Sequence, residues 1–179
     1  MELTEITADQ PMGFLIDSLP GARRSIFARY HLGGCQSCAF SNDESLQQLC
    51  ERSGIDVGEM IDHLKTSHVD DLAMLKSPTE IADHLSDWRL IDLRTREEHE
   101  AVKIPNSGFF TQDLQQTVFA GSHDAQILLY DHCGGNVLDQ VAWFRGHGLQ
   151  RTFGLLGGID AWSQQIDPKI GRYRVEIER

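Results

Sequence analysis

Apolar residues in the first part of the chain recur at the spacing of amphipathic helices. The stripes are Ile26, Phe27 and Tyr30; Leu46, Leu49 and Cys50; and Val57, Met60, Ile61 and Leu64. Gly33-Gly34 and Gly54 are typical helix ends after the first two stripes, and Asp56 is a typical N-cap before the third. Helices of about 10 residues do not persist alone, so residues 1–76 are predicted to form a small all-α domain.

The remaining residues show a different pattern, in which short apolar runs alternate with helical spacing. The predicted strands are residues 89–94, 109–110, 126–130 and 152–155, and the predicted helices follow Thr95 and span residues 138–147 and 159–165. Thr95 and Glu98 have the spacing of a capping box. Strands that alternate with helices favour a parallel sheet flanked by helices. Residues 77–179 are therefore predicted to form an α/β domain.

Charge excludes several classes of partner. The 179 residues include 16 Lys+Arg and 27 Asp+Glu, which gives a net charge of −11. Residues 1–76 carry 6 basic and 12 acidic side chains, and residues 77–179 carry 10 and 15. Neither half has the excess of basic residues that binds nucleic acid or an anionic membrane. The chain also lacks an apolar run of about 18 residues and a basic start typical of a secretory signal, so we expect a cytoplasmic protein.

The chain contains four cysteines, Cys35, Cys38, Cys50 and Cys133. Permanent disulfides are rare in a reducing cytoplasm, so the Cys35-x-x-Cys38 motif has three interpretations. It forms a reversible dithiol, it packs without chemistry, or it binds a metal together with Cys50, His63 and His68. Because CxxC occurs once and Cys50 lies on an apolar stripe, a redox dithiol is favoured, and no metal or other cofactor is predicted.

The second half of the chain resembles the rhodanese family over nearly all of residues 77–179. Leu90–His99 (LIDLRTREEH) resembles the family's D-x-R-T-x-E-E-[FY] segment, Ile104-Pro105 stands at its H-I-P motif, and Gly157–Trp162 (GGIDAW) resembles its G-G-x-x-A-W ending. The resemblance implies a rhodanese-like fold and a sulfurtransferase activity. In that activity a cysteine thiolate takes up a sulfane sulfur as a persulfide and passes it to a thiol acceptor.

The first half resembles the small redox-disulfide domain associated with hybrid-cluster proteins. The resemblance covers roughly residues 12–66 and is carried by Tyr30–Phe40 (YHLGGCQSCAF), by Glu44-Ser45-Leu46 and by Gly54–Val57. It implies that Cys35 and Cys38 form a reversible dithiol.

The loop after the predicted strand 126–130 contains the candidate nucleophile, Cys133. Gly134, Gly135, Asn136 and Val137 follow it and lead into a helix. A loop between a strand and a helix N-terminus presents several backbone N–H groups to one centre, which stabilises a thiolate or persulfide. Glycine permits the positive φ that such a loop requires. We therefore predict a sulfur-binding loop at residues 133–137.

Other residues support or oppose this loop. Asp92 and Arg94 match the family's D-x-R and are expected to form a hydrogen-bonded pair that braces it, and His132 is a candidate base beside the thiol. Asp131 and Asp139 flank the loop and are expected to raise the thiol pKa. Counting back from the glycine that ends the next helix places Asp131, not Cys133, at the family's nucleophile position.

The sequence is compatible with two functions. In the first, Cys133 carries sulfur from a small sulfane-sulfur donor, and the Cys35/Cys38 dithiol, another protein or another thiol acts as acceptor or reductant. In the second, the rhodanese-like fold is catalytically silent and serves as a redox-responsive binding or regulatory module.

Overall fold

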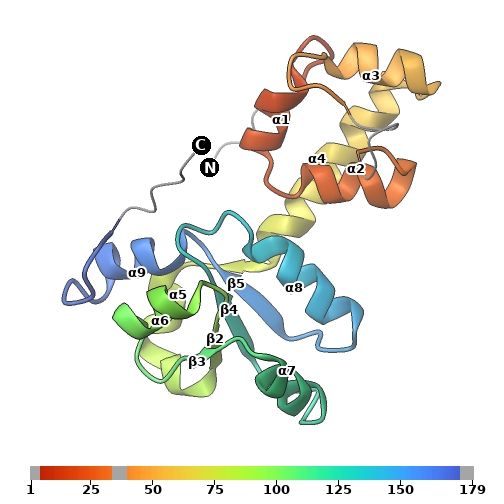
Figure 1. The fold of residues 1–179 in the computed structure, drawn as a ribbon. Helices are drawn as coiled ribbons and strands as arrows, with labels where there is room; N and C mark the ends of the chain where they lie inside the picture. The colour runs from red at the N-terminus through yellow and green to blue at the C-terminus, as the bar shows by residue number, and fades with distance from the viewer. Residues whose placement is uncertain (1–4, 34–39, 174–179) are drawn as a thin grey trace. The chain divides into compact units, whose positions relative to one another are not determined.

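A computed structural model describes residues 5–33 and 40–173 (Figure 1). The chain divides into two compact units, Met1–Ala73 and Met74–Arg179, and each is described by itself. The sequence predicts the division between residues 76 and 77. It falls earlier because β1 (Leu75–Lys76) pairs with β5 (Thr152–Leu155), so these residues belong to the sheet of the second unit.

The described part of the first unit consists of helices. They are α1 (Met12–Ser18), α2 (Ala22–Tyr30), α3 (Leu46–Ser53) and α4 (Val57–Ala73). Ser45 caps α3 through a capping box with Gln48, and Gly54 ends it in the left-handed conformation (φ 68°). The predicted helices around the three apolar stripes are confirmed. The sequence missed α1, and α4 is 17 residues long, well beyond the predicted length.

The core of the first unit contains most of the predicted apolar positions. Ile26, Leu46, Leu49, Met60 and Leu64 are buried together. Cys50 is 1% exposed in the same core, as its place on the stripe predicts, and burial raises the pKa of its thiol. Phe27, in contrast, is 48% exposed, so its position on the first stripe is a wrong prediction of burial.

The second unit contains a five-stranded parallel sheet in the order β1-β5-β4-β2-β3. The remaining strands are β2 (Arg89–Asp92), β3 (Gly108–Phe109) and β4 (Ile127–Tyr130). The helices are α5 (Pro78–Ile81), the 3-10 helix η1 (Ala82–Asp87), α6 (Arg96–Ala101), α7 (Gln112–Phe119), α8 (Val137–Gly146) and α9 (Gly158–Gln165). Figure 1 shows α7 and α8 on one side of the sheet and α5, α6 and α9 on the other. The predicted α/β architecture is confirmed.

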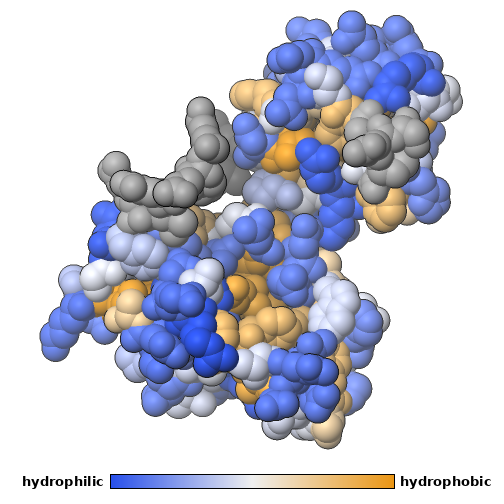
Figure 2. All heavy atoms as spheres, in the orientation of Figure 1, coloured by the Kyte–Doolittle hydropathy of each residue, from blue (hydrophilic) through white to orange (hydrophobic). Residues whose placement is uncertain are grey.

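Each face of the sheet has its own hydrophobic core, because side chains alternate along a strand. On β4, Ile127 and Leu129 pack with residues of α7 and α8, whereas Leu128 and Tyr130 pack with residues of α5 and α9. All four β4 residues are 0% exposed, which explains why this strand is a continuous apolar run in the sequence. The surface is more polar than these cores. Figure 2 shows mostly hydrophilic residues on the visible face of each unit.

Some predicted elements are shifted or missing. β2 ends at Asp92, two residues before the predicted end, because Thr95 already caps α6 with Glu98. α8 begins at Val137, one residue earlier than predicted. The sequence missed α7, in which polar residues occupy most positions and the apolar ones are Leu114, Val118 and Phe119.

Candidate functional site

A pocket of about 550 Å³ lies where β2 and β4 end. These strands are parallel, so the loops that follow them meet at one edge of the sheet. The β4–α8 loop contributes Asp131, His132, Cys133, Gly135 and Asn136 to the lining. The segment after β2 contributes Leu93, Arg94 and Thr95, and Glu98 and Phe110 complete part of the wall. Most residues predicted for the site therefore gather around one pocket.

The β4–α8 loop is folded around the carboxylate of Asp131. Gly134 N–H donates to Oδ1 of this carboxylate, and Asn136 N–H donates to Oδ2 at 2.8 Å. Gly134 has a φ of 85°, as predicted for a loop glycine, whereas Gly135 is outside the left-handed region. Val137 is the first residue of α8 and is 0% exposed, so its side chain belongs to the core. Two of the predicted sulfur-binding amides thus bind an internal anion.

The glycine pair of the predicted G-G-x-x-A-W motif holds this loop in place. Ile159 N–H donates to the Asp131 carbonyl at 3.0 Å, and Asp160 N–H donates to the His132 carbonyl at 3.1 Å. A Cβ on Gly158 would lie 2.5 Å from both carbonyl oxygens, and its φ is 58°. Only glycine allows so close an approach. The N-terminus of α9 therefore holds the loop that carries Cys133 in one position.

The Cys133 thiol is exposed and lines the pocket. Partial burial and the carboxylates of Asp160 and Asp131 raise the pKa of Cys133, and the Arg172 guanidinium opposes this shift. Arg172 is itself paired with Asp160 through Nε, at 2.6 Å, and through Nη2, at 3.0 Å. Of the two flanking aspartates predicted to raise the thiol pKa, Asp131 has the expected effect, and the larger carboxylate contribution comes from Asp160, which the sequence prediction did not name.

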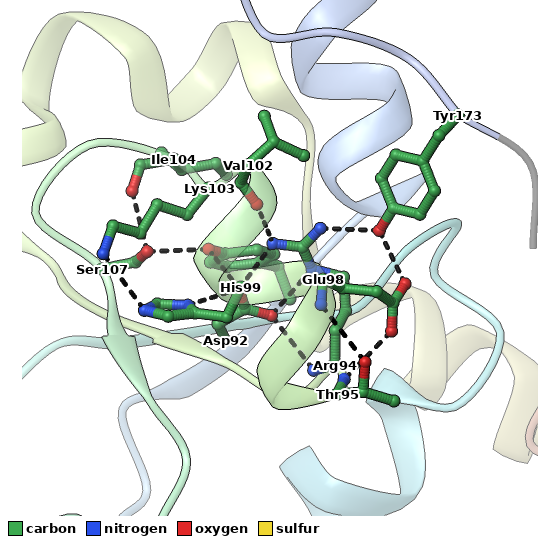
Figure 3. A network of polar contacts seen from close by, with 11 residues as sticks. Asp92, Arg94, Thr95, Glu98, His99, Val102, Lys103, Ile104, Ser107 and Tyr173 are labelled. Atoms are coloured by element: carbon green, nitrogen blue, oxygen red, sulfur yellow. Dashed lines mark hydrogen bonds and ion pairs between the residues drawn. The ribbon is translucent and has the colours of Figure 1, made fainter.

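A buried polar network lies behind the pocket wall (Figure 3). Asp92 is 0% exposed and accepts hydrogen bonds from Arg94 Nε at 2.9 Å, from Arg94 Nη2 at 2.6 Å and from His99 Nδ1 at 2.8 Å. The Tyr130 hydroxyl also donates to Asp92, at 2.9 Å. Burial raises the pKa of Asp92, but the hydrogen bonds from Arg94 and His99 outweigh it and hold the pKa below its ordinary value.

The same network fixes the Arg94 side chain. Besides Asp92, its guanidinium donates to the Val102 carbonyl and to the Tyr173 hydroxyl, each at 2.6 Å. Burial lowers the pKa of Arg94, but the hydrogen bonds to Asp92 and Tyr173 raise it above its ordinary value. Arg94 is therefore a charged residue with its donors directed into the protein, beside the loop that Asp131 organises.

Tyr173 connects this network to the loop. Its hydroxyl donates to Glu98 at 2.7 Å, and its ring stacks on His132 with the ring centroids 4.3 Å apart. Burial and the bond to Glu98 raise the pKa of Tyr173 to about 12. His132 is thus stacked on an aromatic ring at the pocket edge.

Sequence reasoning missed the part that Glu98, His99, Ser107, Tyr130 and Tyr173 take in this network. The sequence does single out His99, because this residue stands where the resembled family motif has Phe or Tyr. Ser107 contacts the Tyr130 hydroxyl at 2.7 Å. Tyr173 follows a polar stretch without hydrophobic periodicity, so the pattern gives no sign of its role.

The predicted dithiol, Cys35 and Cys38, lies outside the described residues. Within residues 5–33 and 40–173, no group of three or more His, Cys, Asp or Glu side chains is arranged to hold a metal ion. His63, one of the alternative ligands, contacts Ser25 Oγ at 2.8 Å through Nε2. Among the described helices, none is both long and apolar enough to cross a membrane.

Residues 77–165 match the family model of the rhodanese-like domain. Together with the parallel sheet and the motifs around the pocket, this match shows that the chain contains a rhodanese-like domain. No match was found among curated proteins.

Several solved structures are similar to this chain. A rhodanese-related protein from Thermoplasma volcanium is 17% identical, with a TM-score of 0.45, over 51% of this chain and 91% of its own. A protein from Lactobacillus plantarum is 16% identical, with a TM-score of 0.47, over 60% and 92%. The human single-domain sulfurtransferase is 18% identical, with a TM-score of 0.44, over 51% and 96%.

Proposed function

We propose that the rhodanese-like domain is a sulfurtransferase that carries sulfane sulfur as a persulfide on Cys133. The observation that supports this most directly is the exposed Cys133 thiol in the lining of the pocket. Cys133 lies in the loop between the buried parallel strand β4 and the N-terminus of α8. Leu93 and Phe110 add apolar surface for the organic part of a donor.

The loading step exchanges one sulfur atom between thiols. The Cys133 thiolate attacks the outer sulfur of a donor persulfide R–S–SH, the S–S bond of the donor breaks, and R–S⁻ leaves. The outer sulfur is then bound to Cys133 as the persulfide Sγ–SH. The proton lost from the Cys133 thiol ends on the donor thiol. The number of electrons on each side is equal, so no external oxidant or reductant is needed. The raised pKa of Cys133 makes this step faster at alkaline pH, because only the thiolate attacks.

The unloading step passes the outer sulfur to a thiol acceptor, and the Cys35/Cys38 dithiol is our proposed intramolecular candidate. One of the two thiolates attacks the outer sulfur and becomes a persulfide, and Cys133 leaves as a thiolate. The second thiol then displaces HS⁻ and forms the Cys35–Cys38 disulfide. The dithiol loses two electrons and the sulfane sulfur gains them. Covalent linkage of both partners in one chain gives an effective concentration of about a millimolar if the linker allows them to meet.

Intact-protein mass spectrometry tests the loading step. A Cys35→Ser/Cys38→Ser background leaves Cys133 and the buried Cys50 as the cysteines of the chain. After incubation with a low-molecular-weight persulfide, we expect a mass gain of one sulfur atom that disappears when Cys133→Ala is added. The second step is tested by sulfide release from the loaded chain, which we expect to require Cys35 and Cys38.

The alternative function is a catalytically silent fold that serves as a redox-responsive binding or regulatory module. The Asp131 carboxylate in the loop is the observation that favours it, because this residue stands at the family's nucleophile position without a gap. The absence of a Cys133-dependent mass gain with any donor would refute the sulfur carrier and leave this alternative.

A further inference from the structure

The Asp131 carboxylate accepts hydrogen bonds from backbone amides of the predicted sulfur-binding loop. One of its carboxylate oxygens accepts from Gly134 N–H and the other from Asn136 N–H. Backbone amides that converge before a helix are a general binding site for anions. In this chain they hold a carboxylate that is covalently part of the loop, so an external anion would have to displace it.

The backbone that carries this carboxylate is held in place by β4 and α9. Asp131 directly follows the buried strand β4, and its own carbonyl accepts the N–H of Ile159 at the start of α9. The residue next to it, His132, is held in the same way by the N–H of Asp160. The carboxylate is therefore part of a rigid arrangement, which lowers the cost of keeping it on the amides.

The charged side chains that line the pocket also oppose an anion. Arg172, whose guanidinium acts on the Cys133 thiol, is paired with Asp160. Among the residues that line the pocket in the described ranges, Arg94 is the only Arg or Lys, and its guanidinium is bound to Asp92, Val102 and Tyr173. The side chain of Arg94 is 1% exposed. Glu98 contributes a second carboxylate to the lining. A thiosulfate dianion that approached Cys133 would meet these carboxylates.

We propose that Asp131 is the specificity-determining residue of this site, because its carboxylate occupies the loop amides and excludes anionic sulfur donors. This inference rests on the proposed sulfur-carrier function and names its donor class. The donors are persulfides whose neighbouring groups are uncharged or positively charged. Thiosulfate and strongly anionic persulfides are excluded.

Anion binding by the loop tests the inference without any sulfur transfer. The full chain is titrated with sodium sulfate at constant ionic strength, and the amide resonances of Gly134 and Asn136 are followed by NMR. We expect saturable shifts in the Asp131→Ala variant and none in the wild type. Asp131→Asn keeps one acceptor oxygen without the charge and is expected to bind more weakly than Asp131→Ala. Asp113→Asn, the same charge change at an exposed position of α7, is expected to behave as the wild type.

Donor choice provides the second measurement. Wild type and variants are loaded with thiosulfate or with cysteamine persulfide, which carries a positive charge, and the rates of Cys133-dependent mass gain are compared. We expect the wild type to prefer cysteamine persulfide. Asp131→Ala is expected to increase the rate with thiosulfate at least about tenfold relative to cysteamine persulfide, the order expected for removing a unit charge a few ångströms from an anion.

The outcomes separate this inference from the proposed function. If neither donor loads Cys133, the sulfur-carrier function fails, and the sulfate titration still decides whether Asp131 blocks the amides. In the other case Cys133 is loaded, and tryptophan fluorescence shows that the Asp131→Ala and Asp131→Asn variants are folded. If these variants then bind no sulfate and keep the wild-type donor preference, the inference is overturned. Equal sulfate binding by the wild type would overturn it as well.

Discussion

The substitution Asp92→Asn tests the contribution of the buried network behind the pocket. Asp92 accepts five hydrogen bonds, from Arg94 N, Nε and Nη2, from His99 Nδ1 and from the Tyr130 hydroxyl. An asparagine keeps the shape but has one oxygen and one NH₂ group. In either orientation, the NH₂ group faces at least two donors, and the guanidinium loses its buried counterion.

The expected loss of stability follows from these contacts. A buried donor without an acceptor costs about 1–3 kcal/mol, and removal of one partner of a buried ion pair costs about 3–5 kcal/mol. The two effects describe overlapping contacts, so they are not added. We expect the unfolding free energy of the second unit to fall by about 3–5 kcal/mol, a large share of the 5–15 kcal/mol typical of a domain.

Urea denaturation of the full chain, followed by tryptophan fluorescence, measures this loss. The three tryptophans, Trp88, Trp143 and Trp162, all lie in the second unit, so the signal reports the unfolding of that unit. Asp113→Asn is the matched control and is expected to change stability by less than about 0.5 kcal/mol. A loss of less than about 1 kcal/mol in Asp92→Asn would refute the reasoning. In the double variant with Arg94→Met, part of the loss should be recovered, because the unpaired charge is removed.

The pH dependence provides a further check of the same prediction. The folded-state pKa of Asp92 lies below its ordinary value, because hydrogen bonds from Arg94 and His99 outweigh burial. Its stabilising contribution is therefore complete above the unfolded pKa of about 3.9 and is lost as the pH falls through the folded pKa. We expect the difference in stability between wild type and Asp92→Asn to decrease below about pH 4. A difference that stays constant down to pH 2 would contradict this assignment.

Three other substitutions have defined expected outcomes. Asp160→Asn removes a carboxylate that raises the pKa of Cys133, so iodoacetamide alkylation of this thiol should reach half its maximal rate at lower pH. Gly158→Ala places a Cβ 2.5 Å from two carbonyl oxygens at a φ of 58°, and should lower stability by about 2 kcal/mol or more. Gly146→Ala, where nothing lies within 4 Å, is its control. Tyr173→Phe removes the acceptor of a buried guanidinium donor and should cost about 1–3 kcal/mol in urea denaturation.

Each of these expectations has a contrary result. An unchanged alkylation profile in Asp160→Asn would mean that this carboxylate does not act on the thiol. Equal stability of Gly158→Ala and Gly146→Ala would mean that the loop moves away from the added methyl group at little cost. A Tyr173→Phe variant as stable as the wild type would mean that the Tyr173 hydroxyl is replaced by water.

The sequence predicted the sheet well where burial dictates composition. β4 is buried on both faces, so Ile127–Tyr130 is apolar throughout, and β5 was predicted with its observed bounds. The capping box formed by Thr95 and Glu98 also predicted correctly where α6 begins. β1 was missed because two residues carry no periodicity.

The candidate site could be predicted only in part. The motif spacing brought Cys133, Arg94 and the loop glycine Gly134 to one region, because parallel strands place their following loops together. The hydrogen bonds of the Asp131 carboxylate could not be predicted, since a strand-to-helix loop allows an aspartate to face solvent or its own amides. The contacts of Tyr173 were also missed, because they join positions 75 and 79 residues apart.

The contacts of Tyr173 also define how much of the chain the rhodanese-like domain needs. The family match ends at residue 165, yet Arg172 and Tyr173 lie beyond it and bind Asp160, Arg94 and Glu98. A recombinant fragment cut at residue 165 would keep every strand of the sheet that the structure describes. It would leave the Arg94 guanidinium with one acceptor fewer and expose His132 to solvent. For this protein, the minimal unit suited to biochemical work extends at least through Tyr173.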